Sequence, residues 1–198
     1  MLRMAAAIET DEQMMARYAA GDASAFDALY QRHEMKVWRF LQRSVRNPAT
    51  ADELMQEVWF AVARQVRQYQ PTARFTTWLF TIAHHRLIDN HRVAKPGAAN
   101  PTYGGDNAGD AQQFVLEQVP DAAHREPLQQ VLADGSAKAL IAAVEQLPNE
   151  QREAFLLQAE GEQSVEEIAV TTGVSFETAK SRLRYARARL KVLLQEYA

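Results

Sequence analysis

Apolar side chains recur at three- and four-residue steps along most of the chain, the spacing that places them on one side of an α-helix. The longest run begins near Phe26, continues to Val45 and stops at Asn47–Pro48. Further runs follow Thr50 and Phe75. Together with a short helix before residue 21, these runs predict a bundle of about four helices in the first half of the chain.

Several predicted helices carry a capping box, in which Ser or Thr precedes Glu or Gln by three residues and the two side chains satisfy free backbone N–H groups at the helix start. Such pairs occur at Thr10–Gln13, Thr50–Glu53 and Ser164–Glu167. We expect a helix to begin at each of them. Asp22 or Ser24 is expected to cap the long second helix.

The character of the chain changes between Val93 and Gly135, an interval that holds five of the eight Gly and four of the seven Pro residues. Turn-forming residues at this density disfavour packed elements and predict a flexible linker, with room for a short helix near 114–119. We therefore expect an all-α protein. Two small helical domains, residues 1–92 and 136–198, would be joined by the linker at 93–135.

The second predicted domain ends in a helix-turn-helix pattern. Leu147–Pro148–Asn149 is expected to end one helix and to cap the next. Ser164 then begins a short helix, and residues 172–174, with Gly173 in the middle, form a turn. Ser175 then caps a last, longer helix. In this motif the second helix enters the major groove of DNA, and its first residues meet base edges.

On the last helix the apolar residues share one side and basic residues lie along both edges of it, which suits contacts to phosphates on either side of a groove. The alternative is a solvated basic face without a partner. The residues expected to contact DNA are Ser175, Glu177, Thr178, Lys180, Ser181, Arg182, Arg184 and Arg187.

Composition narrows the function. The 198 residues include no cysteine, which excludes disulfides and thiolate metal sites. No apolar run approaches the ~20 residues that span a bilayer, and the apolar start is too short for a signal peptide, so we expect a cytoplasmic protein.

The net charge is −3. Because DNA affinity comes largely from phosphate neutralisation, DNA binding then needs a focused basic patch or a partner that holds the protein to DNA, and we expect both.

Three segments in the first domain carry a family resemblance: Asp52-Glu53-Leu54-Met55-Gln56-Glu57-Val58-Trp59-Phe60, then Phe75 with Trp78-Leu79 and Ile82-Ala83, then Asp89 with Arg92. In this order and spacing they resemble the second conserved region of bacterial sigma factors of the extracytoplasmic-function group. Leu147-Pro148 and the helix after it are similar to the entry of the fourth conserved region. The resemblance implies an alternative sigma factor that directs RNA polymerase core to promoters and helps open them.

The resemblance also implies residue roles. The residues implied to bind the polymerase clamp are Asp52, Glu53, Gln56, Glu57 and Phe60. Those implied to face the minus-ten DNA are Tyr69, Arg74, Trp78, His85, Arg86, Asn90 and Arg92, with the loop at 69–74 capturing an unstacked base. The last helix would read the minus-thirty-five element. The family often has Asn where this chain has His85, so the resemblance implies the general role of this position but not its base preference.

Implied partners are the clamp and flap of RNA polymerase core and double- and single-stranded promoter DNA, and the family also admits an anti-sigma factor. We expect no cofactor, no membrane insertion and no enzymatic activity. His84, His85, Asp89 and His91 suggest a metal site, but we favour polar residues facing DNA or solvent. The alternative function is a stand-alone transcription regulator that uses the same helix-turn-helix.

Overall fold

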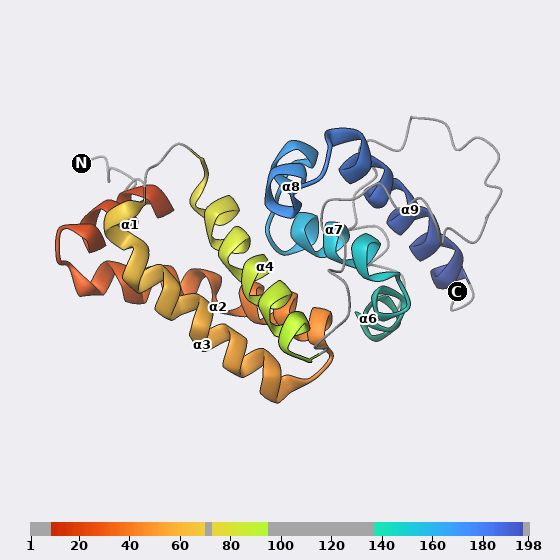
Figure 1. Cartoon of the computed structure of the whole chain (residues 1–198), viewed down its shortest axis with the longest axis horizontal. Coiled ribbons are helices and arrows are strands. Elements are labelled where there is room, and N and C mark those ends of the chain that lie inside the picture. Colours follow the sequence, from red (N-terminus) through yellow and green to blue (C-terminus); the bar gives the residue numbers. More distant parts are fainter. Residues whose placement is uncertain (1–8, 70–72, 95–136, 196–198) are drawn as a thin grey trace, which may run out of the picture.

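A computed structural model describes residues 9–69, 73–94 and 137–195, and throughout this part of the chain the regular structure is helical (Figure 1). This confirms the all-α prediction. The helices are α1 (Asp11–Ala19), α2 (Ala23–Val45), α3 (Pro48–Gln65), the 3-10 helix η1 (Val66–Gln68), α4 (Phe75–Ala94), α6 (Ala137–Glu145), α7 (Asn149–Ala159), α8 (Val165–Thr172) and α9 (Phe176–Gln195). None of these helices is long and apolar enough to cross a membrane.

Local capping chemistry starts the first two helices as predicted. Thr10 accepts a hydrogen bond from the backbone N–H of Gln13 at 3.3 Å, and the Gln13 side chain accepts one from the Thr10 N–H at 2.9 Å. Asp22, rather than Ser24, caps α2, because its carboxylate accepts from the Ser24 N–H at 3.0 Å. The capping-box prediction at Thr10 is confirmed.

The predicted capping box at Thr50–Glu53 is wrong. Helix α3 begins two residues earlier, at Pro48, and Asn47 is its cap: the Asn47 side chain accepts from the N–H groups of Ala49 and Thr50 at 3.0 and 3.3 Å. Pro48 suits the first helical position, where a missing N–H costs nothing. Asn47–Pro48 therefore ends one helix and starts the next.

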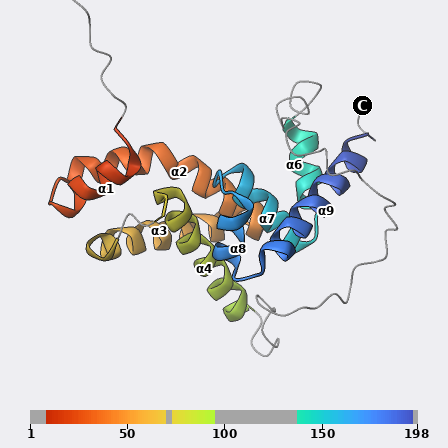
Figure 2. The ribbon, with the colours of Figure 1, turned by 90° about the horizontal axis from the view of Figure 1, so that it is seen from above.

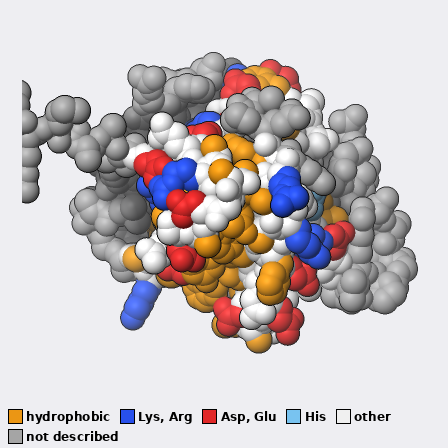
Figure 3. All heavy atoms as spheres, turned by 90° about the vertical axis from the view of Figure 1, so that its left-hand side faces the viewer, with side chains coloured by type: hydrophobic (Ala, Val, Ile, Leu, Met, Phe, Trp, Pro, Cys, Tyr) orange, Lys and Arg blue, Asp and Glu red, His pale blue; other side chains and the backbone are white. Residues whose placement is uncertain are grey.

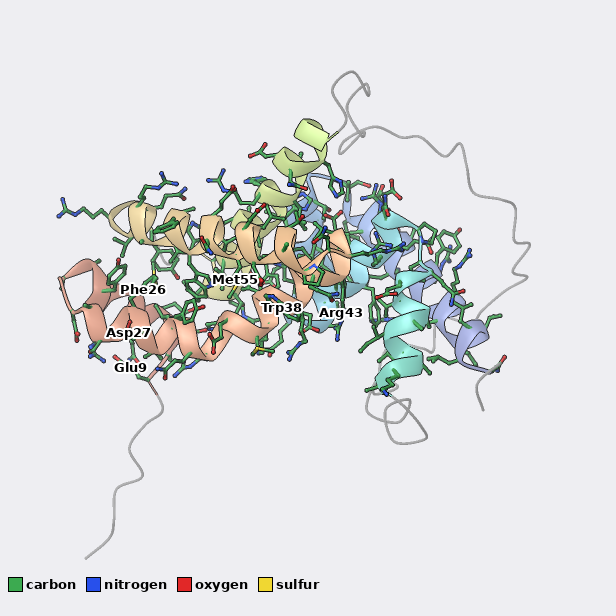
Figure 4. All side chains as sticks on the ribbon, turned by 90° about the horizontal axis from the view of Figure 1, so that it is seen from below. Glu9, Phe26, Asp27, Trp38, Arg43 and Met55 are labelled. Atoms are coloured by element: carbon green, nitrogen blue, oxygen red, sulfur yellow. The ribbon has the colours of Figure 1, made fainter. Side chains whose placement is uncertain are left out.

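The four N-terminal helices enclose one core, in which α2 packs against α1, α3 and α4. The largest buried apolar side chains of α2 are Leu29, Val37, Phe40 and Leu41, which belong to the same apolar cluster as the buried stripes of α3 and α4. Figure 4 shows Phe26, Trp38 and Met55 in the space between α2 and α3. Each fully buried Leu, Val or Phe contributes about 1.5–3 kcal/mol of transfer free energy, so the predicted apolar stripes hold the bundle together.

The C-terminal helices pack around α9, whose buried face is Ala179, Leu183, Ala186 and Leu190, as predicted. Helix α7 differs from expectation, since Pro148 occupies its cap position and no side chain caps it; the Asn149 side chain instead accepts from the Arg152 guanidinium at 2.7 Å. The capping box at Ser164 is confirmed. Gly173 ends α8 with φ 67°, a left-handed conformation that glycine adopts without strain.

The two domains are packed against each other: α4 lies along α8, and α2 contacts α7 (Figures 1 and 2). His84 lies buried in this interface, where its Nδ1 atom is 2.6 Å from Oε1 of Glu153. The expectation that His84 faces DNA or solvent is therefore wrong. Beyond Ala94, the predicted linker and its short helix near 114–119 lie outside the described residues.

Candidate nucleic-acid interface

The outer face of α3 carries the residues that the motif singled out. Leu54, Val58 and Val62 lie on the buried side of α3, and helical geometry therefore turns the opposite side of the helix outward. All five residues implied to bind the clamp are exposed: Asp52, Glu53, Gln56, Glu57 and Phe60. Phe60 is 65% exposed, an unusual position for a large apolar ring in a helix that has a well-formed core side. This acidic face with one apolar ring is a candidate protein-binding surface.

A groove of about 340 Å³ borders this acidic face and lies between α2 and α3, lined by Tyr30, Glu34, Met35, Trp38, Asp52, Met55 and Gln56. The Trp38 indole N–H donates to Oδ1 of Asp52 at 2.8 Å and fixes one side of the groove. Met35, more than half exposed, adds an apolar side chain at its edge. Sequence reasoning did not assign Met35 or Trp38 to the site, because they come from a different helix.

Figure 3 views the molecule from the end at which α1 lies, the left-hand side of Figure 1. An apolar band crosses the middle of this face, with acidic and basic side chains on both sides of it. The face is therefore mixed in charge. A DNA-binding surface would instead show cations gathered together, since phosphate contacts supply most of the affinity.

An aromatic cluster supports the start of α4. The ring of Tyr69 lies 5.0 Å from that of Trp78 and 6.2 Å from that of Phe75, measured between centroids. Burial, with the nearby charges of Glu12 and Asp11, raises the pKa of Tyr69 to about 12. The Tyr69 ring packs against the first turn of α4; residues 70–72 lie outside the described residues.

Arg74 stands at the entrance to α4 and is held by the other domain. Its Nη1 atom donates to the backbone oxygen of Glu162 at 3.1 Å, and its guanidinium lies 3.8 Å from the carboxylates of both Glu162 and Glu167. Glu12 caps α4 by accepting from the Phe75 N–H at 3.0 Å. This hydrogen bond is the main reason that the pKa of Glu12 lies below its usual value.

The later part of α4 presents the remaining minus-ten candidates. His85 is exposed, Arg86 and Asn90 are half-buried, and Arg92 belongs to α4 but its side chain lies outside the described part. Although His85 is exposed overall, partial withdrawal of its imidazole from water, and next the neighbouring His84, lower the pKa of His85 and favour its neutral form. A neutral imidazole can donate and accept hydrogen bonds, which suits contact with a base edge better than with phosphate.

A cleft of about 560 Å³ opens beside these residues, between α4 and the end of α8. His85 and Arg86 line one wall, and Thr172 and Gly173 line the other. Arg86 lies 4.0 Å from Glu57 and 3.7 Å from Asp89, so its charge is shared between carboxylates of α3 and α4. Among the described residues, no group of His, Asp and Glu could hold a metal ion.

The first turn of α9 is built as predicted. Ser175 caps it by accepting from the Thr178 N–H at 3.2 Å, and the hydroxyls of Ser175 and Thr178 lie 2.8 Å apart. Glu177 is exposed, whereas Lys180 and Ser181 are half-buried. Ser175 and Thr178 therefore support the turn through their hydroxyls, and each still has lone pairs for a partner.

The arginines of α9 have intramolecular partners as well as solvent contact. Arg187 donates to Oε1 of Gln158 at 2.7 Å, and Arg184 lies over the Tyr185 ring, 5.0 Å from its centroid. Arg182 is half-buried, with one guanidinium nitrogen that has no hydrogen-bond partner within the described residues. The arginines thus share one helix, with Arg184 and Arg187 exposed and Arg182 half-buried.

Three carboxylates that the sequence analysis did not assign to any site also contact candidate residues. Glu162 and Glu167 contact Arg74, and Glu153 contacts His84. Each pair joins residues about 70 or more positions apart in sequence, with separations of 69 and 88 for the pairs that form hydrogen bonds. No local pattern in the sequence indicates such pairs.

Comparisons with known proteins identify the family of the chain. Residues 29–96 match the family model described as Sigma-70 region 2, and residues 137–190 match that described as Sigma-70, region 4. The chain is 30% identical to the RNA polymerase sigma factor CarQ of Myxococcus xanthus, over 92% of this chain and 96% of CarQ. It is 31% identical to the ECF RNA polymerase sigma factor SigL of Mycobacterium tuberculosis, over 90% of this chain and 93% of SigL.

Solved structures show the same fold. CnrH in complex with the cytosolic domain of CnrY matches with a TM-score of 0.63 at 21% identity, covering 96% of this chain and all of CnrH. The sigma factor RpoE in complex with the anti-sigma factor NepR, from Bartonella quintana, matches with a TM-score of 0.60 at 23% identity, covering 86% and 96%. The chain therefore belongs to the extracytoplasmic-function group of the sigma-70 family and is an alternative RNA polymerase sigma factor.

Proposed function

We propose that residues 1–92 bind RNA polymerase core and open the minus-ten DNA, that residues 136–198 read the minus-thirty-five element, and that residues 93–135 link the two. The observation that carries this proposal is the division of exposed residues: acidic residues and Phe60 on α3, and basic residues along α9. The work of the protein is binding, so its residues act through charge, shape and hydrogen bonding.

The clamp-binding part of the proposal rests on α3. Asp52, Glu53 and Glu57 form an exposed acidic face, and Phe60 offers an apolar anchor within it. Interfaces commonly combine a large aromatic anchor with a polar rim that fixes orientation and speeds association. A basic surface on the polymerase clamp is the expected counterpart.

The DNA-reading part rests on α9 and α4. The net charge of the chain is −3, yet four cations lie along α9: Lys180, Arg182, Arg184 and Arg187. Positive charge is therefore concentrated on the helix that would enter a groove of the DNA. Ser175, Glu177, Thr178 and Ser181, near the start of α9, would approach base edges. The flap of core is the proposed second contact of this domain.

For promoter opening, we assign base capture to the loop before α4. Tyr69, which precedes this loop, and Trp78 of α4 pack against each other, with ring centroids 5.0 Å apart. Extruding a base costs a few kcal/mol, which polar and stacking contacts to the extruded base offset. Arg74, His85, Arg86, Asn90 and Arg92 would then contact the separated strands. An anti-sigma factor is a further proposed partner, supported by the NepR complex of the similar RpoE.

The test is co-purification with bacterial core RNA polymerase, using the full chain and a version without residues 136–198, followed by transcription from candidate promoters. We expect both versions to bind core and only the full chain to give promoter-dependent transcripts. Sequence-specific DNA binding by the free protein without any core binding would instead indicate a stand-alone regulator.

A further inference from the structure

We propose that Glu12 of α1 is a positioning residue for promoter opening: it holds the peptide unit at which α4 begins, and with it Arg74 and the first turn of the proposed minus-ten surface. This inference rests on the proposed role of α4 in opening promoter DNA. Helix α1 carries none of the segments of the family resemblance, and the match to Sigma-70 region 2 covers residues 29–96, which begin after it.

Helix α1 is itself firmly placed in the N-terminal domain. Met14 and Met15 are fully buried in the core that α1 shares with α2. The capping box at Thr10 fixes the first turn of α1. This turn is therefore a rigid support for the carboxylates of Asp11 and Glu12, and it lies near the start of α4 (Figure 1).

The peptide unit between Arg74 and Phe75 is held at both of its polar atoms. Its N–H, from Phe75, donates to Oε1 of Glu12 at 3.0 Å, and its carbonyl oxygen, from Arg74, accepts from the Trp78 N–H at 3.2 Å. The second bond lies within α4, whereas the first comes from a residue 63 positions away in the sequence. The first N–H groups of a helix have no partner in their own helix, so Glu12 supplies a bond that α4 cannot make.

A second contact from α1 supports the same residue of α4. Oδ2 of Asp11 lies 2.8 Å from Nε2 of the buried His33, and the His33 ring lies 5.4 Å from that of Phe75, measured between centroids. Oδ1 of Asp11 accepts from the Arg32 guanidinium at 2.6 Å, which fixes the carboxylate. Phe75 is therefore held at its backbone by Glu12 and at its ring by His33.

The order imposed on Phe75 extends to the proposed minus-ten surface. The Phe75 ring lies 6.0 Å from that of Trp78 and 6.2 Å from that of Tyr69, between centroids, and Arg74 shares the peptide unit that Glu12 holds. A surface whose backbone is already ordered loses less conformational entropy when it captures a base than one that DNA must order. Helix α1 thus favours base capture through α4.

The competing role for Glu12 is local to α1. Glu12 also lies in the first turn of α1, where a carboxylate interacts favourably with the positive end of the helix dipole. If this were its whole contribution, loss of the carboxylate would lower the free energy of unfolding and leave the DNA affinity of the folded protein unchanged. Affinity for unpaired minus-ten DNA therefore separates the two roles.

The test uses the full chain with Glu12→Ala, assembled with core RNA polymerase. The probe is a single DNA strand that carries the minus-ten sequence of a promoter from which the wild-type protein transcribes. We expect the variant to bind this strand about fivefold more weakly, the effect of a typical lost helix cap. Opening of the duplex promoter, measured by permanganate reactivity of unpaired thymines, should fall with it. Affinities for core and for a minus-thirty-five duplex should stay unchanged.

Two further variants control for charge and for the acceptor atom. Glu12→Gln keeps an oxygen that can accept from the Phe75 N–H and should recover most of the affinity for the single strand. Glu9→Ala removes the same group three positions earlier, where its carboxylate pairs with Arg17 of α1 at 2.8 Å, and should bind the strand like the wild type. Thermal unfolding establishes that each variant is folded at the temperature of the assay.

Three results would overturn the positioning role: wild-type affinity of Glu12→Ala for the single strand, an equal loss in Glu9→Ala, or a parallel loss of core affinity. This failure differs from that of the proposed function. If the wild-type protein with core neither bound the strand nor transcribed, the proposed function would fail and this inference with it. If the wild type bound the strand and Glu12→Ala bound it equally well, only the positioning role would fail.

Discussion

At the scale of single residues, several side chains assigned to nucleic acid have partners within the chain. Arg74 pairs with Glu162 and Glu167, and Arg187 donates to Gln158. Exposed ion pairs contribute only about 0–1 kcal/mol, so phosphates can replace these partners at little cost. The intramolecular contacts therefore orient the arginines without preventing DNA binding.

Arg184 provides a prediction about DNA binding. It is exposed on α9 and contacts only the neighbouring Tyr185 among the described hydrogen bonds. Arg184→Ala should weaken promoter binding and reduce the slope of log affinity against log salt by about 1, the value for one lost phosphate contact. Binding isotherms at several salt concentrations measure both effects. Lys138→Ala removes one exposed charge from α6 and should leave the slope unchanged.

Glu57 provides a prediction about core binding. Its carboxylate is exposed and lies 4.0 Å from Arg86, so it does not hold the fold together. Glu57→Lys should reduce core affinity by about 100-fold or more, since a like-charge contact across an interface costs several kcal/mol. Titration of labelled core measures this affinity, with Glu150→Lys on α7 as a control. Unchanged core affinity in the Glu57 variant would contradict the clamp assignment.

At the scale of elements, the dipeptide Arg46–Asn47 both ends α2 and caps α3. Arg46 ends α2 in a left-handed conformation with φ 59°, and Asn47 immediately caps α3. Only one residue therefore separates the end of α2 from the cap of α3. The short connection sets the antiparallel packing of α3 against α2 and so places the acidic face of α3 outward.

The corrected start of α3 gives a stability prediction. Asn47→Ala removes two cap hydrogen bonds and should lower the free energy of unfolding by about 1 kcal/mol, within the range for lost helix caps. Thr50→Ala should have a smaller effect, because Thr50 lies inside the helix and its side chain does not cap it. Urea unfolding followed by circular dichroism compares the two variants. A larger loss in the Thr50 variant would restore the capping box as the helix start.

At the scale of the whole molecule, the domains form one docked unit through α2, α4, α7 and α8. Charged and polar pairs join them, and the buried apolar side chains of the two domains also form one continuous cluster. The docked unit therefore combines apolar packing, which supplies transfer free energy, with charged contacts that fix the orientation of the domains.

Acidification should weaken the docked unit. The Lys36 hydrogen bond holds the pKa of Glu162 below its usual 4.5; for Glu167, burial raises the pKa, but hydrogen bonds from Ser164 and Thr77 and the Arg74 charge outweigh it. Because both folded-state pKa values are lowered, their stabilisation is present above pH 4.5 and is lost as pH falls below it. Thermal unfolding between pH 6 and about pH 3 measures this loss, and Glu167→Gln should flatten the dependence. An unchanged slope in that variant would show that Glu167 contributes nothing.

The sequence alone determined the helical class, the helix-turn-helix and most helix starts. The reason is that this information is local: apolar spacing reports one turn of a helix, and a cap acts within three residues, as at Thr10, Ser164 and Ser175. The prediction at Thr50 was wrong because Asn47–Pro48 fits both the end of one helix and the start of the next, and only its role as a helix end was considered.

Only the tertiary structure decided which surfaces meet. Glu160 and Arg39 are separated by 121 residues, and His84 and Glu153 by 69, yet each pair is in contact. Such pairs form because two folded domains present complementary charge and shape, which no window of the sequence contains. The sequence thus determined which side chains each helix exposes, and the docking of α4 on α8 decided which of them face each other instead of DNA.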